Sequence, residues 1–168
     1  MALALLFAIN TLNFYDRHIL ATVTEPIRRQ YGFTDTQMGW LGTAFILLYA
    51  VVGVPFGRLA DRYNRKLLLV AGLFFWSVLT ALSGAAVGFW SLFVSRPGMG
   101  VGAAVCAPTA SSRIGAFYPA SRRARALSLF MLGLPIGAAL SYWISGAVAQ
   151  SFGWRAAFFI AGIPGCLL

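Results

Sequence analysis

The stretch "GRLADRYNRK" at residues 57–66 decides the fold, because it places four basic residues between two long apolar runs. The chain as a whole is 60% hydrophobic and only 10% charged, whereas soluble domains are about 45–50% apolar and about 25% charged. A membrane-spanning helix needs about 20 mainly apolar residues. The stretch therefore predicts a loop at the membrane surface between two spanning helices.

Apolar runs continue on both sides of this loop. Five of them are long enough to cross a bilayer, at about 2–23, 38–59, 66–87, 90–116 and 125–148. A sixth begins near Arg155 and stops at Leu168, which is too short to cross, so we expect the chain to be part of a longer protein. The sequence thus predicts an all-α membrane protein with five full spans and an incomplete sixth at 155–168.

The basic residues predict the orientation of these spans. A second basic stretch, "FYPASRRARA" at 117–126, lies two crossings after the first, and the two stretches hold seven Lys and Arg residues against three in the opposite loops. Excess positive charge marks the cytoplasmic side. We therefore expect 57–66, 117–126 and the N-terminus to be cytoplasmic and 24–37 to be external. Within 24–37, Thr34 and Gln37 have the spacing of a helix capping box.

The formal net charge of +9 does not indicate nucleic-acid binding, because most of the arginines lie in short loops between apolar runs. The first residues lack the basic region and cleavage site of a signal peptide. We expect a multi-pass integral protein of the bacterial inner membrane, whose surroundings are the lipid bilayer and which has no nucleic-acid partner.

The sequence also lacks the residue sets of the common catalytic and metal sites. Cys106 and Cys166 lie in apolar segments without CxxC spacing, and His18 is the only histidine. No Ser/His/Asp constellation, Cys/His pair or metal-ligand set is recognisable around His18. We therefore expect no enzyme activity, no metal and no cofactor other than protons as coupling ions.

Small residues recur at helical spacing in the apolar runs. Gly98 pairs with Gly102, and Gly133 pairs with Gly137 on either side of Pro135. In lipid, small residues allow close approach of helix backbones, and proline removes a backbone donor and bends a helix. The 133–137 segment is either a static packing wedge or a moving seam.

Polar residues line one face of the first span. Asn10, Asn13 and Asp16 or Arg17 are spaced by three or four, and a charge at mid-bilayer costs at least about 2.5–3.5 kcal/mol. A local ion pair between Asp16 and Arg17 is one explanation, although adjacent helical positions diverge by about 100°. The other is a proton site, in which an apolar surrounding favours the neutral carboxyl and a moving Arg17 contact favours the carboxylate.

Arg96 in the fourth span has three possible roles. It could extend to the external surface, bind an anionic head group or pair with Asp16. Asn10, Asn13, Arg96 and Tyr49 are the predicted substrate-binding residues, although aromatic positions such as Tyr49 are equally expected to pack or to face lipid.

Together these residues resemble a known family. The 57–66 stretch matches the G-x-L-x-D-R-x-x-R-K signature of the major facilitator superfamily at Gly57, Leu59, Asp61, Arg62, Arg65 and Lys66. The Arg96/Gly100 spacing and the "GWRAAF" segment agree with it. The resemblance implies the N-terminal six-helix half of this fold, built from inverted three-helix repeats, with a C-terminal half as its partner outside this chain.

Within that superfamily, "NFYDRHIL" and "GVGAAVCAPTASS" are similar to the Spinster branch. This similarity implies a secondary active transporter that moves a lysophospholipid-like or sphingolipid-like amphiphile by proton-linked alternating access. A drug, sugar or organic-anion carrier of the same superfamily, or a non-transporting membrane scaffold, are the alternatives. Spinster proteins usually carry a glutamate in the fourth helix where this chain has Ala104, so a family acid is missing here.

The resemblance also assigns a role to the first basic stretch. We expect Gly57, Asp61, Arg62, Arg65 and Lys66 to form a cytoplasmic gating loop, in which Asp61 pairs with Arg113 or with a helix of the other half as a latch. A purely topological role for the basic residues is the alternative.

Overall fold

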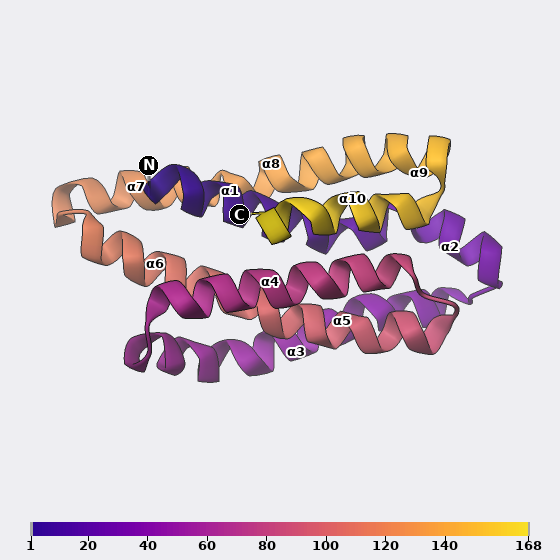
Figure 1. The fold of residues 1–168 in the computed structure, drawn as a ribbon, viewed down its shortest axis with the longest axis horizontal. Coiled ribbons are helices and arrows are strands. Elements are labelled where there is room, and N and C mark those ends of the chain that lie inside the picture. The colour runs from indigo at the N-terminus through magenta and orange to yellow at the C-terminus, as the bar shows by residue number, and fades with distance from the viewer. Residues whose placement is uncertain (1, 168) are drawn as a thin grey trace.

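A computed structural model describes residues 2–167, and the side chains of residues 57, 59–62, 65 and 167 lie outside the described set. The described residues form helices joined by short turns, with no strand among them. The helices lie roughly parallel to the long axis of the molecule (Figure 1). The predicted all-α class is confirmed.

Six rods follow one another in the described chain. The first rod is α1 (Ala2–Thr22) continued by α2 (Thr24–Tyr31), the second is α3 (Asp35–Arg62), and the third is α4 (Arg65–Gly84). The fourth rod is α5 (Phe89–Ala104) continued by α6 (Cys106–Phe117). The fifth rod joins α7 (Ala120–Met131), α8 (Gly133–Leu140), the π-helical turn η1 (Ser141–Ser145) and α9 (Gly146–Phe152), and the sixth is α10 (Trp154–Leu167). The rods match the predicted spans in number and order.

The end of α3 differs from the prediction. The helix continues to Arg62, so most of the predicted loop 57–66 is helical and only residues 63 and 64 connect it to α4. Arginine, leucine and alanine are good helix formers, and charge alone does not end a helix. The boundary is instead set by Asn64, whose side-chain oxygen accepts hydrogen bonds from the backbone nitrogens of Lys66 at 3.0 Å and Leu67 at 3.4 Å.

The other ends shift by a few residues. The second rod begins at Asp35 rather than 38, the third ends at Gly84 rather than 87, and the fifth covers 120–152 rather than 125–148. The predicted external stretch 24–37 contains the helix α2. The capping box is present, because the backbone nitrogen of Thr34 donates to the Gln37 side chain at 2.9 Å and that of Gln37 donates to the Thr34 hydroxyl at 3.3 Å.

Prolines explain three interruptions within the rods. Pro26, Pro108 and Pro135 have no N–H to donate to the carbonyls four residues before them, those of Thr22, Ala104 and Met131. The α-helix is interrupted directly after Thr22, Ala104 and Met131, between α1 and α2, between α5 and α6 and between α7 and α8. The predicted bend near Pro135 thus coincides with a break in the rod.

Glycines bring α8 against α1. A Cβ atom at Gly133 would lie 3.0 Å from the backbone nitrogen of Thr11, and one at Gly137 would lie 3.0 Å from the backbone nitrogen of Tyr15. The α5–α4 contact is equally close, because a Cβ at Gly102 would lie 2.8 Å from Cβ of Trp76. The small residues therefore set how closely these rods approach, as expected for helices packing in lipid.

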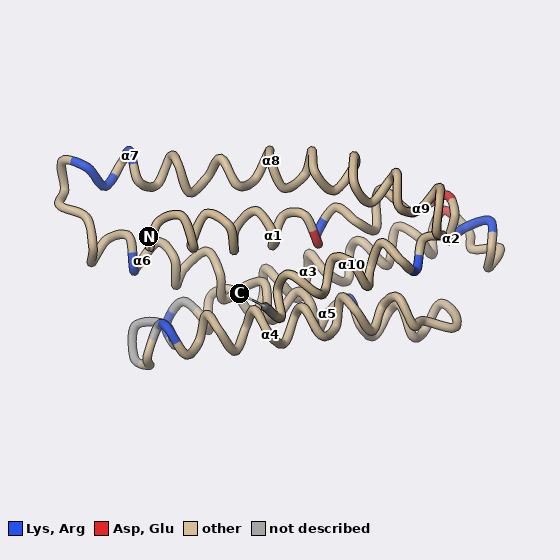
Figure 2. Tube along the Cα trace, turned by 45° about the horizontal axis from the view of Figure 1, so that its top comes forward, with Lys and Arg blue, Asp and Glu red and all other residues tan. Residues whose placement is uncertain are grey.

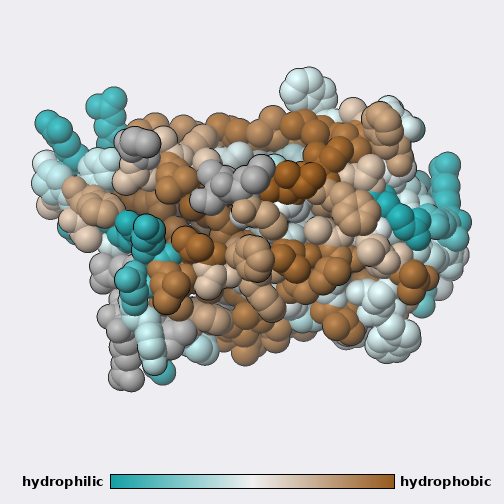
Figure 3. All heavy atoms as spheres, in the orientation of Figure 1, coloured by the Kyte–Doolittle hydropathy of each residue, from teal (hydrophilic) through white to brown (hydrophobic). Residues whose placement is uncertain are grey.

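The surface suits a bilayer. Among the described residues, three helical segments are long and apolar enough to cross a membrane, namely Asp35–Phe56, Lys66–Gly84 and Ala120–Phe152. Charged residues gather at the two ends of the bundle, and α1 carries an acidic and a basic residue midway (Figure 2). The face shown in Figure 3 has a hydrophobic band between hydrophilic ends.

Candidate substrate and proton site

The two asparagines of α1 connect rods. The Asn10 amide donates to the carbonyl of Phe130 in α7 at 2.8 Å, and the Asn13 amide donates to the carbonyl of Ala103 in α5 at 3.5 Å. Both side chains are buried, and neither lines the cavity described below. The structure gives them a packing role, and their predicted contact with substrate remains a prediction.

Asp16 lies inside the bundle with only 4% of its surface exposed. The indole nitrogen of Trp76 donates to its Oδ2 atom at 3.0 Å, and the Thr80 hydroxyl donates to the same atom at 3.4 Å. Oδ1 is buried and has no hydrogen-bond partner. Desolvation favours the neutral carboxyl while the two donors favour the carboxylate, so opposing influences act on one group that is sheltered from lipid.

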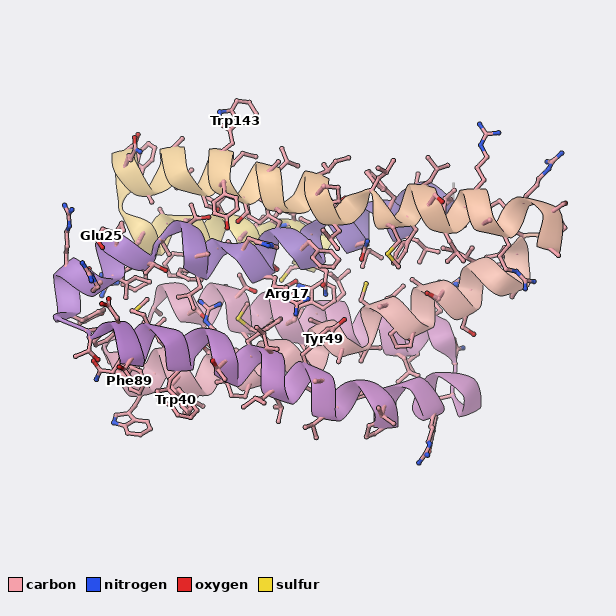
Figure 4. The ribbon with its side chains drawn as sticks, turned by 180° about the vertical axis from the view of Figure 1, so that it is seen from behind. Arg17, Glu25, Trp40, Tyr49, Phe89 and Trp143 are labelled. Atoms are coloured by element: carbon pink, nitrogen blue, oxygen red, sulfur yellow. The ribbon has the colours of Figure 1, made fainter. Side chains whose placement is uncertain are left out.

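Arg17 points away from Asp16, toward α3. Its guanidinium carbon lies 4.9 Å from the ring centroid of Tyr49, 5.3 Å from that of Phe45 and 5.8 Å from that of Phe14. The Phe45 and Tyr49 rings are stacked, and Figure 4 shows Arg17 and Tyr49 side by side between α1 and α3. Asp16 and Arg17 form no salt bridge with each other, so a self-cancelling local pair does not explain the two charges.

Arg96 in α5 is buried, with 2% of its surface exposed. Its guanidinium carbon lies 5.2 Å from the Phe158 ring of α10, and its Nε and one Nη atom are buried without a hydrogen-bond partner. Arg96 therefore does not extend to the external surface. Arg96 and Asp16 form no salt bridge with each other.

A cavity of about 240 Å³ brings both arginines together. Its lining is Arg17, Leu20, Ala21 and Thr24 of the first rod, Met38, Leu41, Gly42, Phe45 and Ile46 of α3, and Arg96. Tyr49 stacks on Phe45 and contacts the Arg17 guanidinium through its ring, but it does not line the cavity. The cavity thus presents two cationic groups on a largely apolar wall, an arrangement suited to an anionic head group with an apolar neighbour.

The remaining predicted residues have different placements. Ala104 is buried at the end of α5, with 2% of its surface exposed. Lys66 and Arg113 line a separate hollow of about 230 Å³, and the Arg113 guanidinium lies 5.3 Å from the Phe117 ring. The side chains of Gly57, Asp61, Arg62 and Arg65 lie outside the described residues, so the latch remains a prediction.

Sequence reasoning missed the two donors to Asp16. Trp76 and Thr80 lie four residues apart on α4 and so share a face, and both side chains are almost fully buried. A tryptophan N–H in an apolar span needs an acceptor, and Asp16 is the one acid within a predicted span. This argument would have predicted a hydrogen bond from Trp76 to Asp16. No feature of the sequence indicated that Phe158 would contact Arg96.

The fold and these intramembrane charges define the class of protein. Residues 6–168 match the family model of the Major Facilitator Superfamily, and the chain belongs to this family. It is therefore an integral membrane protein with a transporter fold.

Individual relatives show which branch of the superfamily the chain resembles. The chain is 37% identical over 146 residues to a zebrafish (Danio rerio) protein described as "Sphingosine-1-phosphate transporter SPNS2", covering 86% of this chain and 29% of that protein. It is 34% identical over 167 residues to the "Probable L-galactonate transporter" of Escherichia coli, covering 99% and 37%. A crystal structure of a bacterial homologue of the human lysosomal transporter Spinster, inward-facing and occupied, superposes with a TM-score of 0.93 at 33% identity, covering 98% of this chain and 41% of that one. The chain thus spans about a third of the length of these relatives, and it resembles the Spinster branch as the sequence predicts.

Proposed function

We propose that this chain is the N-terminal half of a secondary active transporter that moves an anionic, lipid-like amphiphile by proton-linked alternating access together with a C-terminal half. The observation that carries the proposal is the placement of buried Asp16 and Arg96 and half-buried Arg17 in an apolar bundle without salt bridges among them. Ionisable groups are costly in a membrane interior and mark substrate or proton paths when they occur there. The names of the Spinster-type relatives agree with this substrate class.

The geometry separates two tasks. Arg17 and Arg96 face the cavity and hold the anionic head group, while the leucine, methionine and phenylalanine side chains around them hold its apolar part. Asp16 does not line the cavity and instead lies against α4, where it binds and releases the proton.

Flux through the complete protein in proteoliposomes tests the proton role. Asp16→Asn keeps the shape of the side chain but cannot exchange a proton, so it is expected to abolish flux driven by a pH gradient while exchange without a gradient continues. Asp35→Asn is the matched control, because it makes the same chemical change at an exposed carboxyl at the first residue of α3. Unchanged pH-driven flux in Asp16→Asn refutes the proton role. Ala104→Glu, measured alongside, tests whether restoring the family acid strengthens coupling.

Substitution of the cationic residues tests the substrate class. Arg96→Gln is expected to reduce flux of a lysophospholipid with a net negative head group more than flux of a zwitterionic one. Equal loss for both lipids would contradict head-group recognition by Arg96.

A small organic anion is the second candidate substrate. The cavity of about 240 Å³ is smaller than the pockets of about 300–1,000 Å³ that usually enclose drug-sized ligands, and one relative is named as a sugar-acid transporter. Competition decides between them: a sugar acid that blocks lysolipid flux at similar concentrations favours this candidate.

We further propose a bacterial inner-membrane location with the basic end of the bundle and the N-terminus in the cytoplasm. The uneven distribution of basic residues supports this orientation. A cysteine placed at Arg58 is expected to react only from the cytoplasmic side, and one placed at Asp35 only from the outside. The reverse pattern would overturn the orientation.

A further inference from the structure

A further basic hollow lies apart from the cavity of Arg17 and Arg96 and from the hollow lined by Lys66 and Arg113. It has a volume of about 490 Å³ and is lined by Leu3 of α1, Tyr118 at the end of the α6 rod, and Arg122, Arg125, Ala126 and Leu129 of α7. It lies at the end of the bundle where Figure 2 shows basic residues at the start of α7.

The walls of this hollow divide into two kinds. Arg122 and Arg125 are exposed, and neither takes part in a salt bridge within the described part of the chain. Arg123, between them, is already committed, because its guanidinium donates to the carbonyl of Gly115 at 2.8 Å. Leu3 and Leu129 supply an apolar wall of the same hollow. The hollow therefore joins two free guanidiniums to an apolar surface at the edge of the membrane.

The charges around it favour an anion. Among the side chains that the structure describes, Glu25 and Asp35 pair with arginines of the α2 region at the opposite end, and Asp16 is buried in the middle. No described carboxylate lines the hollow. A purely topological role for Arg122 and Arg125 needs their charge alone, and it does not account for an apolar wall beside them.

We propose that this hollow binds an anionic phospholipid, with its phosphate on Arg122 and Arg125 and an acyl chain along Leu3 and Leu129. Planar guanidiniums recognise phosphate oxygens in a bidentate manner, and basic pockets between transmembrane helices on the cytoplasmic side bind acidic head groups. The site lies between the start of α1 and the start of α7, so the lipid contacts two rods that also meet at Asn10 and Phe130. This site does not depend on the transported substrate, and it rests on the proposed function only for the cytoplasmic orientation of this end of the bundle.

Lipid binding to the complete purified protein tests the proposal. Titration of detergent-solubilised protein with phosphatidylglycerol and with phosphatidylcholine is followed by native mass spectrometry. The doubly substituted Arg122→Gln/Arg125→Gln protein is expected to lose about 30-fold in phosphatidylglycerol affinity, from roughly one juxtamembrane charge interaction per residue, with phosphatidylcholine affinity unchanged.

A matched double variant distinguishes lipid binding at this hollow from a general effect of positive surface charge. Arg58→Gln/Arg123→Gln removes the same charge from the same end, and neither residue lines the hollow. It is expected to lose less than threefold. Equal losses in the two double variants, no loss in the first, or displacement of the lipid by millimolar inorganic phosphate would each overturn the lipid site. Arg122→Lys/Arg125→Lys, which keeps the charge and loses the planar fork, is expected to show an intermediate affinity and excludes misfolding as the cause of a loss.

Discussion

Replacing Gly137 by alanine is expected to lower the free energy of unfolding, because this glycine forms the closest approach of α8 to α1. The added Cβ would meet the carbonyl oxygen of Thr11, and it would lie 3.0 Å from both Cβ of Phe14 and the backbone nitrogen of Tyr15. Two of these three atoms belong to the backbone and cannot rotate away. The rods must therefore separate.

The size of the effect follows from two opposing contributions. Overpacking a close contact costs about 1–3 kcal/mol, whereas alanine is more favourable than glycine inside a helix by about 0.5–1 kcal/mol. We expect a net loss of about 1–2 kcal/mol for Gly137→Ala. Gly133→Ala should be milder, because two of its three close contacts at 3.0–3.1 Å are side-chain atoms, Nδ2 of Asn10 and Oγ1 of Thr11.

Gly39→Ala is the matched control. No atom lies within 4 Å of a Cβ at this exposed position of α3, so only the helix preference remains and stability should rise by about 0.5–1 kcal/mol. Unfolding titrations with dodecyl sulfate in mixed micelles measure all three variants. If Gly137→Ala proves as stable as Gly39→Ala, close packing of α8 on α1 is not what these glycines provide, and the reasoning is wrong.

Three further predictions concern single contacts. Tyr49→Phe should keep substrate affinity, whereas Tyr49→Leu removes a ring from the Arg17 guanidinium and should weaken anion binding by about fivefold, measured by equilibrium binding in detergent. Arg155 donates to the Tyr31 hydroxyl at 2.7 Å and to Gln30 at 3.2 Å, so Arg155→Gln should speed amide exchange in α2 relative to α8; equal exchange in both would contradict this tie. The hydrogen bond from Arg29, aided by the charge of Arg28, lowers the pKa of Glu25 in the folded protein. The ionised Glu25 therefore stabilises the fold at pH values above the pKa that Glu25 has in the unfolded chain. This contribution is lost as the pH falls through the lower pKa that Glu25 has in the folded protein. Glu25→Gln should therefore flatten that acid-side loss in a thermal melt, and an unaltered pH profile would exclude the contribution.

The spans were predictable because long apolar runs separated by basic stretches leave few alternatives. The end of α3 was not, because the predicted boundary followed charge, while the helix followed the helix-forming residues up to Arg62 and stopped before the cap at Asn64. Asparagine is a favoured N-cap, so the sequence did hold that signal.

The candidate site was predictable only in part. The sequence left a local ion pair between Asp16 and Arg17 open, and the structure excludes it by placing the two side chains toward α4 and α3. Which residues contact the side chains of Asp16 and Arg17 depends on how rods that are distant in sequence pack together. The periodicity of a single sequence does not contain that information. The same holds for Arg96, whose neighbour Phe158 lies 62 residues further along the chain.

The π-helical turn Ser141–Ser145 holds one residue more than a regular α-helical turn would need. Ser141 and Ser145 are buried, and Ser145 shares a hydrogen bond of 2.8 Å with the Tyr15 hydroxyl, whereas Trp143 is 74% exposed and points away from the bundle (Figure 4). Elsewhere in this rod, deleting one residue would rotate everything beyond it by about 100°. Deleting Trp143 instead removes the surplus residue, so the segment from Gly133 to Phe152 is expected to become one continuous α-helix in which α9 keeps its orientation toward its neighbours. This turn is therefore the one place in the fifth rod where the chain can shorten by a residue without turning α9 away from the helices that it packs against.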